Sequence, residues 1–357
     1  MVAYRKIDRM PGRYLASCIR AAWLLPWLVA AAAWAFATAA DASTLDIVRA
    51  RGKLLCGSAD PLPGFAQQNS DGRWSGFDVD FCRAVAAAVF GDPNKVEFRP
   101  MTGSSRFALL QTGTVDLLAR DAAWTMRRDS GYGASYVGAS FFDGQGFLVH
   151  QSLNVVSAYE LNKLRVCVLD GGDEVLNVRD FFFQNQAAYT EVLYEDREDL
   201  TVAYQAGLCD AVSANVSWLY AMKRALPDPS MHLILPERIS KDSFGPVVRD
   251  GDDQWFNIVK WTLFTLIDAE EVGITADNIG SLAAAKTPAI RRMLGLEGTF
   301  GAGMGLGPDF MKSIIGAVGN YGEIFDRNFG PNTGVPLLRG QNALWTRGGL
   351  LFAPPVE

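Results

Sequence analysis

Short apolar runs alternate with amphipathic helical patterns along most of the chain. Residues 54–56, 95–99 and 115–119 have the length and composition of buried strands, and residues 77–90 and 104–111 repeat apolar positions at helical spacing. Such alternation is typical of α/β folds, in which helices cover a largely parallel sheet. This part of the chain therefore predicts one α/β layer.

A second set of strands and helices follows. We expect strands at 166–168, 191–194 and 211–213, and helices at 175–186 and 200–205. The segments QTGTVDLLARD at 111–121 and QAGLCDAVSAN at 205–215 both predict a helix end, a glycine cap, a buried strand and a loop. The repetition predicts two similar lobes, each a sheet flanked by helices.

Two segments are suited to joining the lobes. Residues 144–149 and 243–248 are short apolar runs beside glycine or proline, as expected of strands that cross between lobes and absorb a hinge rotation. The chain is thereby divided into lobe one, lobe two and a tail rich in Gly and Pro, at 41–147 with 247–329, at 148–246, and at 330–357. Further helices are expected at 255–271, near 276–295 and at 308–326.

The position of a binding site follows from this organisation. In open α/β sheets, ligands bind beyond the carboxyl ends of the strands. The loops that follow the predicted strands are therefore expected to face one another across a cleft, at 57–65, 119–128, 169–174 and 213–217.

The first forty residues have a different pattern. Five basic residues precede or open an apolar run at 21–36, and the small-residue stretch 37–40 follows. This order is typical of a secretory signal peptide, with cleavage expected after Ala39 or Ala40 and export from the cytoplasm. An uncleaved membrane anchor is the alternative, because the run 21–40 approaches the length of a membrane span.

The net charge of the chain limits the classes of molecule that it is expected to bind. The formal net charge is −6, and loss of the five basic residues and one aspartate before residue 41 would make it −10. An acidic protein is a poor partner for nucleic acid. The two histidines, His150 and His232, are far apart in the sequence, and the glycine run at 301–307 does not follow a strand. We therefore expect no metal and no cofactor. The protein is also expected to be a monomer.

Four cysteines remain beyond the predicted signal peptide. An even count in an exported chain indicates disulfides, and four cysteines allow three pairings. The clustering in the sequence favours Cys56 with Cys82 and Cys167 with Cys209.

Several motifs resemble one protein family. They are TLDIVRARG at 44–52, GFDVDFCRAV at 76–85, GDDQWF at 251–256, GNYGEIFDRN at 319–328 and NALW at 342–345. Together they resemble the periplasmic general (polar) L-amino-acid-binding proteins of ABC transporters. The resemblance implies a two-lobed, type II periplasmic binding fold. It also implies that the chain captures an amino acid or a related polar molecule between its lobes and delivers it to the transporter's permease.

The resemblance also implies ligand-binding residues. In that family an arginine after the third strand of lobe one holds the ligand carboxylate, and here it is Arg128. The full set of candidates on the predicted loops is Arg128, Asp60, Phe65, Asp121, Trp124, Asp173 and Asn215.

This chain departs from the family pattern at three of the loops. Asn215 stands where relatives carry an aspartate for the ligand ammonium group, Ala123 lies where hydroxyl residues are usual, and the loop 170–174 is acidic. Asp121 and Asp173 offer compensating carboxylates. The expected result is a more acidic pocket that favours a cationic ligand, with an ordinary amino acid as the alternative.

Two other functions remain open from the sequence. The same fold hosts enzymes that resemble cyclohexadienyl dehydratase, and a carboxylate-rich cleft with Arg128 is compatible with proton transfer. An orphan ligand sensor is the third possibility.

Overall fold

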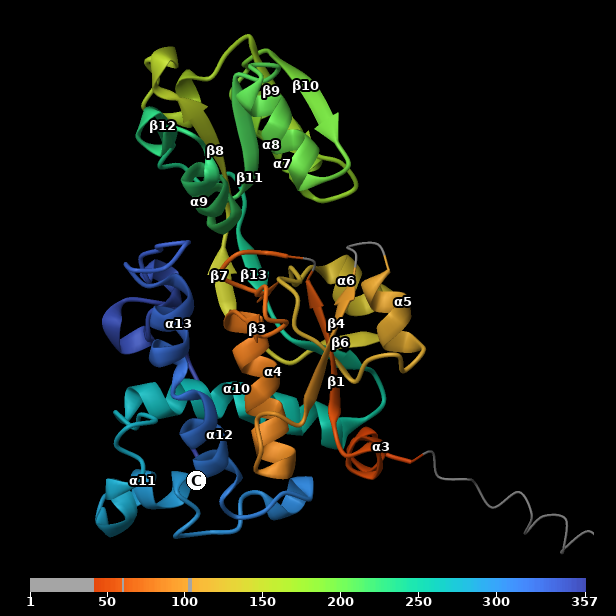
Figure 1. Ribbon diagram of the computed structural model, residues 1–357, viewed down its shortest axis with the longest axis vertical. Coiled ribbons are helices and arrows are strands. Elements are labelled where there is room, and N and C mark those ends of the chain that lie inside the picture. The colour runs from red at the N-terminus through yellow and green to blue at the C-terminus, as the bar shows by residue number, and fades with distance from the viewer. Residues whose placement is uncertain (1–41, 60, 102–104) are drawn as a thin grey trace, which may run out of the picture. The chain divides into compact units, whose positions relative to one another are not determined.

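The computed structural model describes residues 42–357 except residues 60 and 102–104 (Figure 1). The chain divides into two compact units, Met1–Ala42 and Ser43–Glu357, and every element described below belongs to the second. The predicted signal peptide and the candidate ligand residue Asp60 lie outside the described residues. Within the described part, no helix combines the length and the apolar character needed to span a membrane.

The first sheet has five strands in the order β4-β1-β5-β14-β6. Their bounds are β1 Leu54–Ala59, β4 Val96–Met101, β5 Leu117–Leu118, β6 Ala134–Tyr136 and β14 Val247–Arg249. The strands β4, β1 and β5 run parallel, and β14 pairs antiparallel with both β5 and β6. A strand from residue 247 onwards therefore completes a sheet that the chain began near residue 54.

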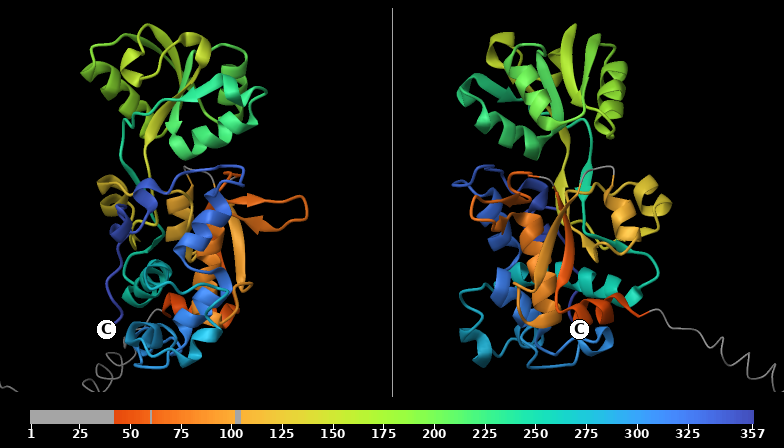
Figure 2. Two further views of the ribbon diagram at one scale, coloured as in Figure 1. Left: turned by 90° about the vertical axis from the view of Figure 1, so that its left-hand side faces the viewer. Right: turned by 45° about the vertical axis from the view of Figure 1, so that its right-hand side comes forward.

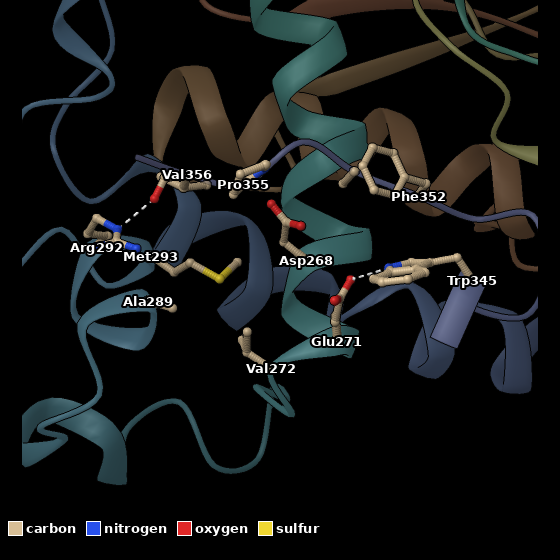
Figure 3. A pocket seen from close by; sticks show the side chains of 11 residues that line it. Asp268, Glu271, Val272, Ala289, Arg292, Met293, Trp345, Phe352, Pro355 and Val356 are labelled. Carbon is tan, nitrogen blue, oxygen red and sulfur yellow. Dashed lines mark hydrogen bonds between the residues drawn. The ribbon is translucent and has the colours of Figure 1, made fainter. Parts of the chain in front are cut away.

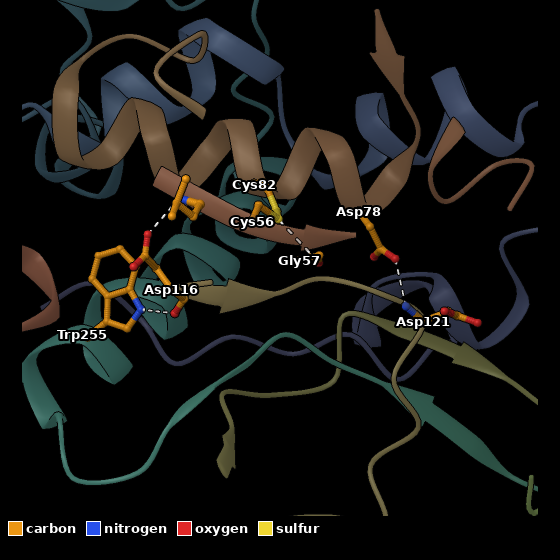
Figure 4. Close-up of a disulfide and its surroundings, with 8 residues drawn as sticks. Cys56, Gly57, Asp78, Cys82, Asp116, Asp121 and Trp255 are labelled. Atoms are coloured by element: carbon orange, nitrogen blue, oxygen red, sulfur yellow. Dashed lines mark hydrogen bonds between the residues drawn. A yellow bond between two sulfur atoms is a disulfide. The ribbon is translucent and has the colours of Figure 1, made fainter. Parts of the chain in front are cut away.

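Helices cover this sheet. They include α3 Thr44–Arg51, α4 Phe77–Phe90, α5 Arg106–Gln111, α6 Met126–Gly131, α10 Asp253–Glu271, α12 Phe310–Val318 and α13 Tyr321–Phe329. Helix α4 packs against α12, α10 and β1 (Figure 2). The disulfide Cys56–Cys82 joins β1 to α4, and Trp255 of α10 donates its indole N–H to the Asp116 carbonyl oxygen at 2.9 Å (Figure 4). The disulfide fixes α4 against β1, and the Trp255 contact fixes α10 at the start of β5.

The second sheet also has five strands, in the order β10-β9-β11-β8-β12. Their bounds are β8 Gln145–His150, β9 Leu164–Leu169, β10 Tyr189–Tyr194, β11 Ala211–Asn215 and β12 His232–Ile234, and the helices that belong to this sheet are α7 Glu174–Gln184, α8 Arg197–Gln205 and α9 Val216–Ala225. The disulfide Cys167–Cys209 joins β9 to the segment after α8. Both cysteine pairs are those favoured by the sequence.

A pair of antiparallel strands lies on the chain's path between the two sheets. Strand β7 (Phe141–Asp143) precedes β8, and β13 (Asp242–Phe244) precedes β14. Both lie between the two sheets in Figure 1. The lobe boundaries at 148 and 246 remain predictions.

The repeated segments have a common physical basis. Asp116 and Asp210 directly precede strands β5 and β11, and each accepts a hydrogen bond at 2.8 Å from the backbone N–H of a residue on the neighbouring strand, Leu55 and Arg165 respectively. Each aspartate also donates its own backbone N–H to the carbonyl of that same residue at 2.9 Å. The similar sequences therefore specify the same strand-pairing device in both sheets.

Two helix predictions are wrong. Residues 308–326 form two helices, because Gly319 has φ 82° and ψ −171° and ends α12. Asn320 then caps α13, its side chain accepting from the Glu323 N–H while the Glu323 carboxylate accepts from the Asn320 N–H. Residues 276–295 likewise contain only the 3-10 helix Ser281–Ala284 and the short helix α11 (Pro288–Met293).

Candidate ligand-binding site

Arg128 lies in the short helix α6, which follows β5. The Thr125 side chain caps this helix by accepting from the Arg128 N–H at 3.4 Å. The Arg128 guanidinium donates to the Ala123 carbonyl oxygen at 3.1 Å, and the Tyr136 hydroxyl donates to the same oxygen at 2.8 Å. The Arg128 side chain is only 13% exposed. The bond to Ala123 uses only Nη1, so the rest of the guanidinium can bind another partner.

Ion pairs connect the loops of the two sheets. Arg128 Nη2 lies 3.1 Å from the Asp173 carboxylate, and Arg127 approaches the same carboxylate at 3.8 Å. Arg197, the first residue of α8, lies 3.8 Å from the Asp121 carboxylate. The structure therefore brings together three predicted site residues, Arg128, Asp121 and Asp173, from the predicted loops 119–128 and 169–174.

Asp121 occupies an unusual position. Its φ of 36° lies in the left-handed region, which few residues other than glycine adopt, and its backbone N–H donates to the Asp78 carboxylate at 2.9 Å (Figure 4). Arg120 Nη1 lies 3.8 Å from Asp121 Oδ1, but that oxygen is buried and has no hydrogen-bond partner. Asp121 therefore offers a buried acceptor atom.

Three arginines of the site were not predicted. They are Arg106, at the start of α5, Arg120, directly after β5, and Arg197. Among the described residues, the Nε atoms of Arg106 and Arg197 are buried and have no hydrogen-bond partner. Burial, with the nearby positive charges of Arg120 and Arg128, lowers the pKa of Arg106. Arg120 could have been found by the rule that placed the loops, because it follows a strand directly. Arg106 and Arg197 carried no such signal.

These arginines alter the expected charge of the site. Burial raises the pKa of Asp78 to about 7, and burial also raises the pKa values of Glu174 and Asp242, near Asp173. Part of the acidic character read from the sequence is therefore weakened by burial, while guanidinium groups surround Asp121. The prediction of a predominantly acidic pocket left these arginines out.

The remaining predicted residues are more scattered. Trp124 is 39% exposed and stacks on Tyr136 with ring centroids 5.5 Å apart. Phe65 is 1% exposed and packs edge-on against Phe141 and Phe329, so its ring belongs to an aromatic core cluster. Asn215 ends β11, opposite Gln145 of β8. Among the described residues, no hydrogen bond or ion pair joins Phe65 or Asn215 to Arg128.

Two hollows lie at other places. One, of about 240 Å³, is lined by α10, α11 and the chain end, including Asp268, Met293 and Phe352 (Figure 3). The other, of about 380 Å³, lies beside His150 and His232. Within the described part of the chain, no cluster of three or more His, Cys, Asp or Glu side chains is arranged to hold a metal ion.

Comparison with known proteins shows which family shares this sequence and architecture. Residues 54–276 match the bacterial extracellular solute-binding proteins, family 3. The general L-amino acid-binding periplasmic protein AapJ of Rhizobium johnstonii is 46% identical over 323 residues, 90% of this chain and 95% of that protein. The glutamate/glutamine/aspartate/asparagine-binding protein BztA of Rhodobacter capsulatus is 48% identical over 322 residues, again 90% and 95%.

A solved structure is similar over nearly the whole described body. It is an ABC transporter periplasmic binding protein from Brucella ovis with glutathione bound, 44% identical, with a TM-score of 0.85 and coverage of 88% of this chain and 100% of that one. The resemblance inferred from the motifs is thus confirmed, and the names of these relatives do not favour a dehydratase. The chain belongs to the bacterial extracellular solute-binding proteins of family 3 and has the two-lobed fold of periplasmic binding proteins.

Proposed function

We propose that this protein is exported to the periplasm, binds an amino acid or a closely related zwitterion between its lobes, and delivers it to the permease of an ABC transporter. The names of AapJ and BztA support the ligand class, and the glutathione-bound relative supports a ligand built from amino acids. In this proposal the protein acts as a monomer and catalyses no reaction.

The unpaired buried atoms around Asp121 carry the proposal. Within the part of the chain that the structure describes, Asp121 Oδ1 is an acceptor without a donor, and Arg106 Nε and Arg197 Nε are donors without an acceptor. Leaving a buried polar atom unpaired costs about 1–3 kcal/mol. A zwitterion supplies both missing kinds of partner, because its carboxylate accepts hydrogen bonds and its ammonium group donates them.

Each charged group of the ligand has a counterpart. Arg128 is suited to the α-carboxylate, since a guanidinium binds a carboxylate through two parallel hydrogen bonds. Asp121 and Asp173 are suited to the ammonium group. Arg128 and Asp173 come from different sheets, so a ligand that binds both would hold the two lobes together. Trp124 is proposed to border the ligand.

Calorimetry on the purified protein tests this function. We expect at least one standard amino acid or glutathione to bind, and Arg128→Gln to weaken that binding about ten- to a hundredfold, since a hydrogen bond to a charged group contributes about 1.5–3 kcal/mol. The matched control is Arg99→Gln, because Arg99 is a half-exposed arginine that pairs with Glu97 on β4. Equal affinity in the Arg128 variant and the wild type would contradict the assignment.

A further inference from the structure

The charged groups of the site form two poles. The first pole is Arg128 with its partner Asp173, 3.1 Å apart. The second is Asp121, with Arg120 and Arg197 each at 3.8 Å and Arg106 close enough for its pKa to be affected by the Asp121 charge. A single amino-acid carboxylate bound at Arg128 would use only the first pole.

The second pole has an excess of positive charge. The guanidinium groups of Arg120 and Arg197 each lie 3.8 Å from the Asp121 carboxylate, which is too far for a hydrogen bond, and the Arg106 charge interacts with the same carboxylate. Two further acids interact with this pole, Asp78 with Arg120 and Glu174 with Arg197, but burial raises the pKa of Asp78 to about 7 and also raises the pKa of Glu174, so both are weaker counter-charges than an exposed carboxylate. Positive charges that are partly removed from water require an anion nearby.

The donors of the second pole are also held in place. Arg120 Nε donates to the Met101 carbonyl oxygen at 2.7 Å, which fixes that side chain against β4. The Arg197 guanidinium lies over the Trp218 ring, 5.7 Å from its centroid. Arg106 lies over the ring of Phe107 at 5.2 Å. Each arginine is thus positioned by a contact, and among the described residues Arg106 and Arg197 each keep a buried Nε atom without an acceptor, as a preformed anion site requires.

We propose, as an extension of the function proposed above, that Arg106, Arg120 and Arg197 form a second anion subsite and that the preferred ligand carries two carboxylates and one ammonium group. Arg128 binds one carboxylate and the second pole binds the other. Asp173, with Glu174 and Asp242 beside it, faces the ammonium group. An acidic amino acid and a glutamyl peptide such as glutathione share this set of charges, and they differ in the distance between the carboxylates.

A pair of nearly isosteric ligands tests the second subsite. Glutamate and glutamine differ at the side-chain terminus, where glutamate carries a carboxylate and glutamine a neutral amide. For the wild type, calorimetry is expected to give at least about tenfold tighter binding of glutamate, or of glutathione over its C-terminal amide, as one additional charge-assisted hydrogen bond requires. Glutamate and glutathione differ in the distance between their carboxylates, so whichever binds more tightly shows which of the two distances fits the site.

The variants separate the two poles. Arg106→Gln is expected to reduce the preference for the second carboxylate to within about threefold, while Arg128→Gln weakens both members of a pair and keeps their ratio. Arg106→Lys should retain part of the preference, and thermal unfolding checks that each variant is folded. Arg73→Gln, with a side chain 81% exposed, is the control and should retain both affinities.

The two proposals fail in different ways. Equal binding of both members of each pair, or an equal loss for both in Arg106→Gln, would overturn the second subsite while leaving amino-acid binding in place. Binding of none of these ligands would overturn both.

Discussion

Asp268 is a buried carboxyl group that the proposed ligand site does not use. It lies on α10 with 9% of its surface exposed, and its Oδ2 atom is buried without a hydrogen-bond partner. It faces the hollow lined by Met293 and Phe352 (Figure 3). Burial, followed by the negative charge of Glu271, raises its pKa from 3.8 to about 7.

This group is expected to make folding stability depend on pH. The folded state holds the Asp268 proton more tightly than the unfolded state, so its favourable contribution is complete below about pH 4 and is lost as the pH rises towards 7. The loss is about 1.4 kcal/mol for each pH unit between the two pKa values. Asp268→Asn should therefore raise the midpoint of thermal unfolding at pH 8 relative to wild type, with little change at pH 4.

The control for this experiment is Asp277→Asn, because Asp277 is an exposed aspartate in the segment that follows α10. The Asp277 variant should behave as the wild type at both pH values. An identical shift of the Asp268 variant at pH 4 and pH 8 would show that the effect does not come from ionisation.

At the scale of the elements, each sheet has its own disulfide, which joins one of its strands to a neighbouring segment. Cys56–Cys82 closes a segment with a sequence separation of 26, and Cys167–Cys209 closes one of 42. The two links lie in different sheets, so neither fixes one sheet to the other.

Removal of either disulfide is expected to destabilise the protein. For these loop lengths, the chain-entropy relation gives about 3–4 kcal/mol for each link. Replacement of both cysteines of one pair by alanine should lower the midpoint of unfolding in denaturant by a similar amount for either pair. The ligand affinity of the folded protein should change little. Unaltered unfolding under reducing and oxidising conditions would contradict this expectation.

The elements also show which features were predictable. Local patterns predicted α4 with its observed bounds and located strands β1, β4 and β11, because hydrophobic spacing and glycine caps act over a few residues. The break at Gly319 was missed because the apolar pattern continues across it. Arg106 and Arg197 were missed because their role depends on packing between segments about ninety residues apart in the sequence. Phe65 follows a strand, as a ligand contact would, but a cluster of aromatic side chains buries it.

At the scale of the whole protein, the ion pairs between loops of different sheets matter most. Arg128 with Asp173, and Arg197 with Asp121, are the pairs that a ligand would enter. A ligand that contacts groups from both sheets favours conformations in which those groups are close.

Small-angle scattering can measure this effect. Addition of a saturating ligand is expected to reduce the radius of gyration of the wild type and to leave that of Arg128→Gln close to its ligand-free value at the same concentration. If calorimetry verifies the variant's weaker binding and the variant still compacts as much as the wild type, compaction does not depend on the Arg128 contact.

The tail contributes to the connection between the sheets through one side chain. Asn342 accepts from the Phe142 N–H at 2.7 Å and donates to the Phe142 carbonyl oxygen at 2.8 Å, so its amide occupies the edge of β7 as a neighbouring strand would. The β7–β13 pair is a sheet of only two strands, and an exposed strand edge is a template for pairing with other chains. Because Asn342 covers this edge, we expect it to keep β7 from pairing with a strand of another chain.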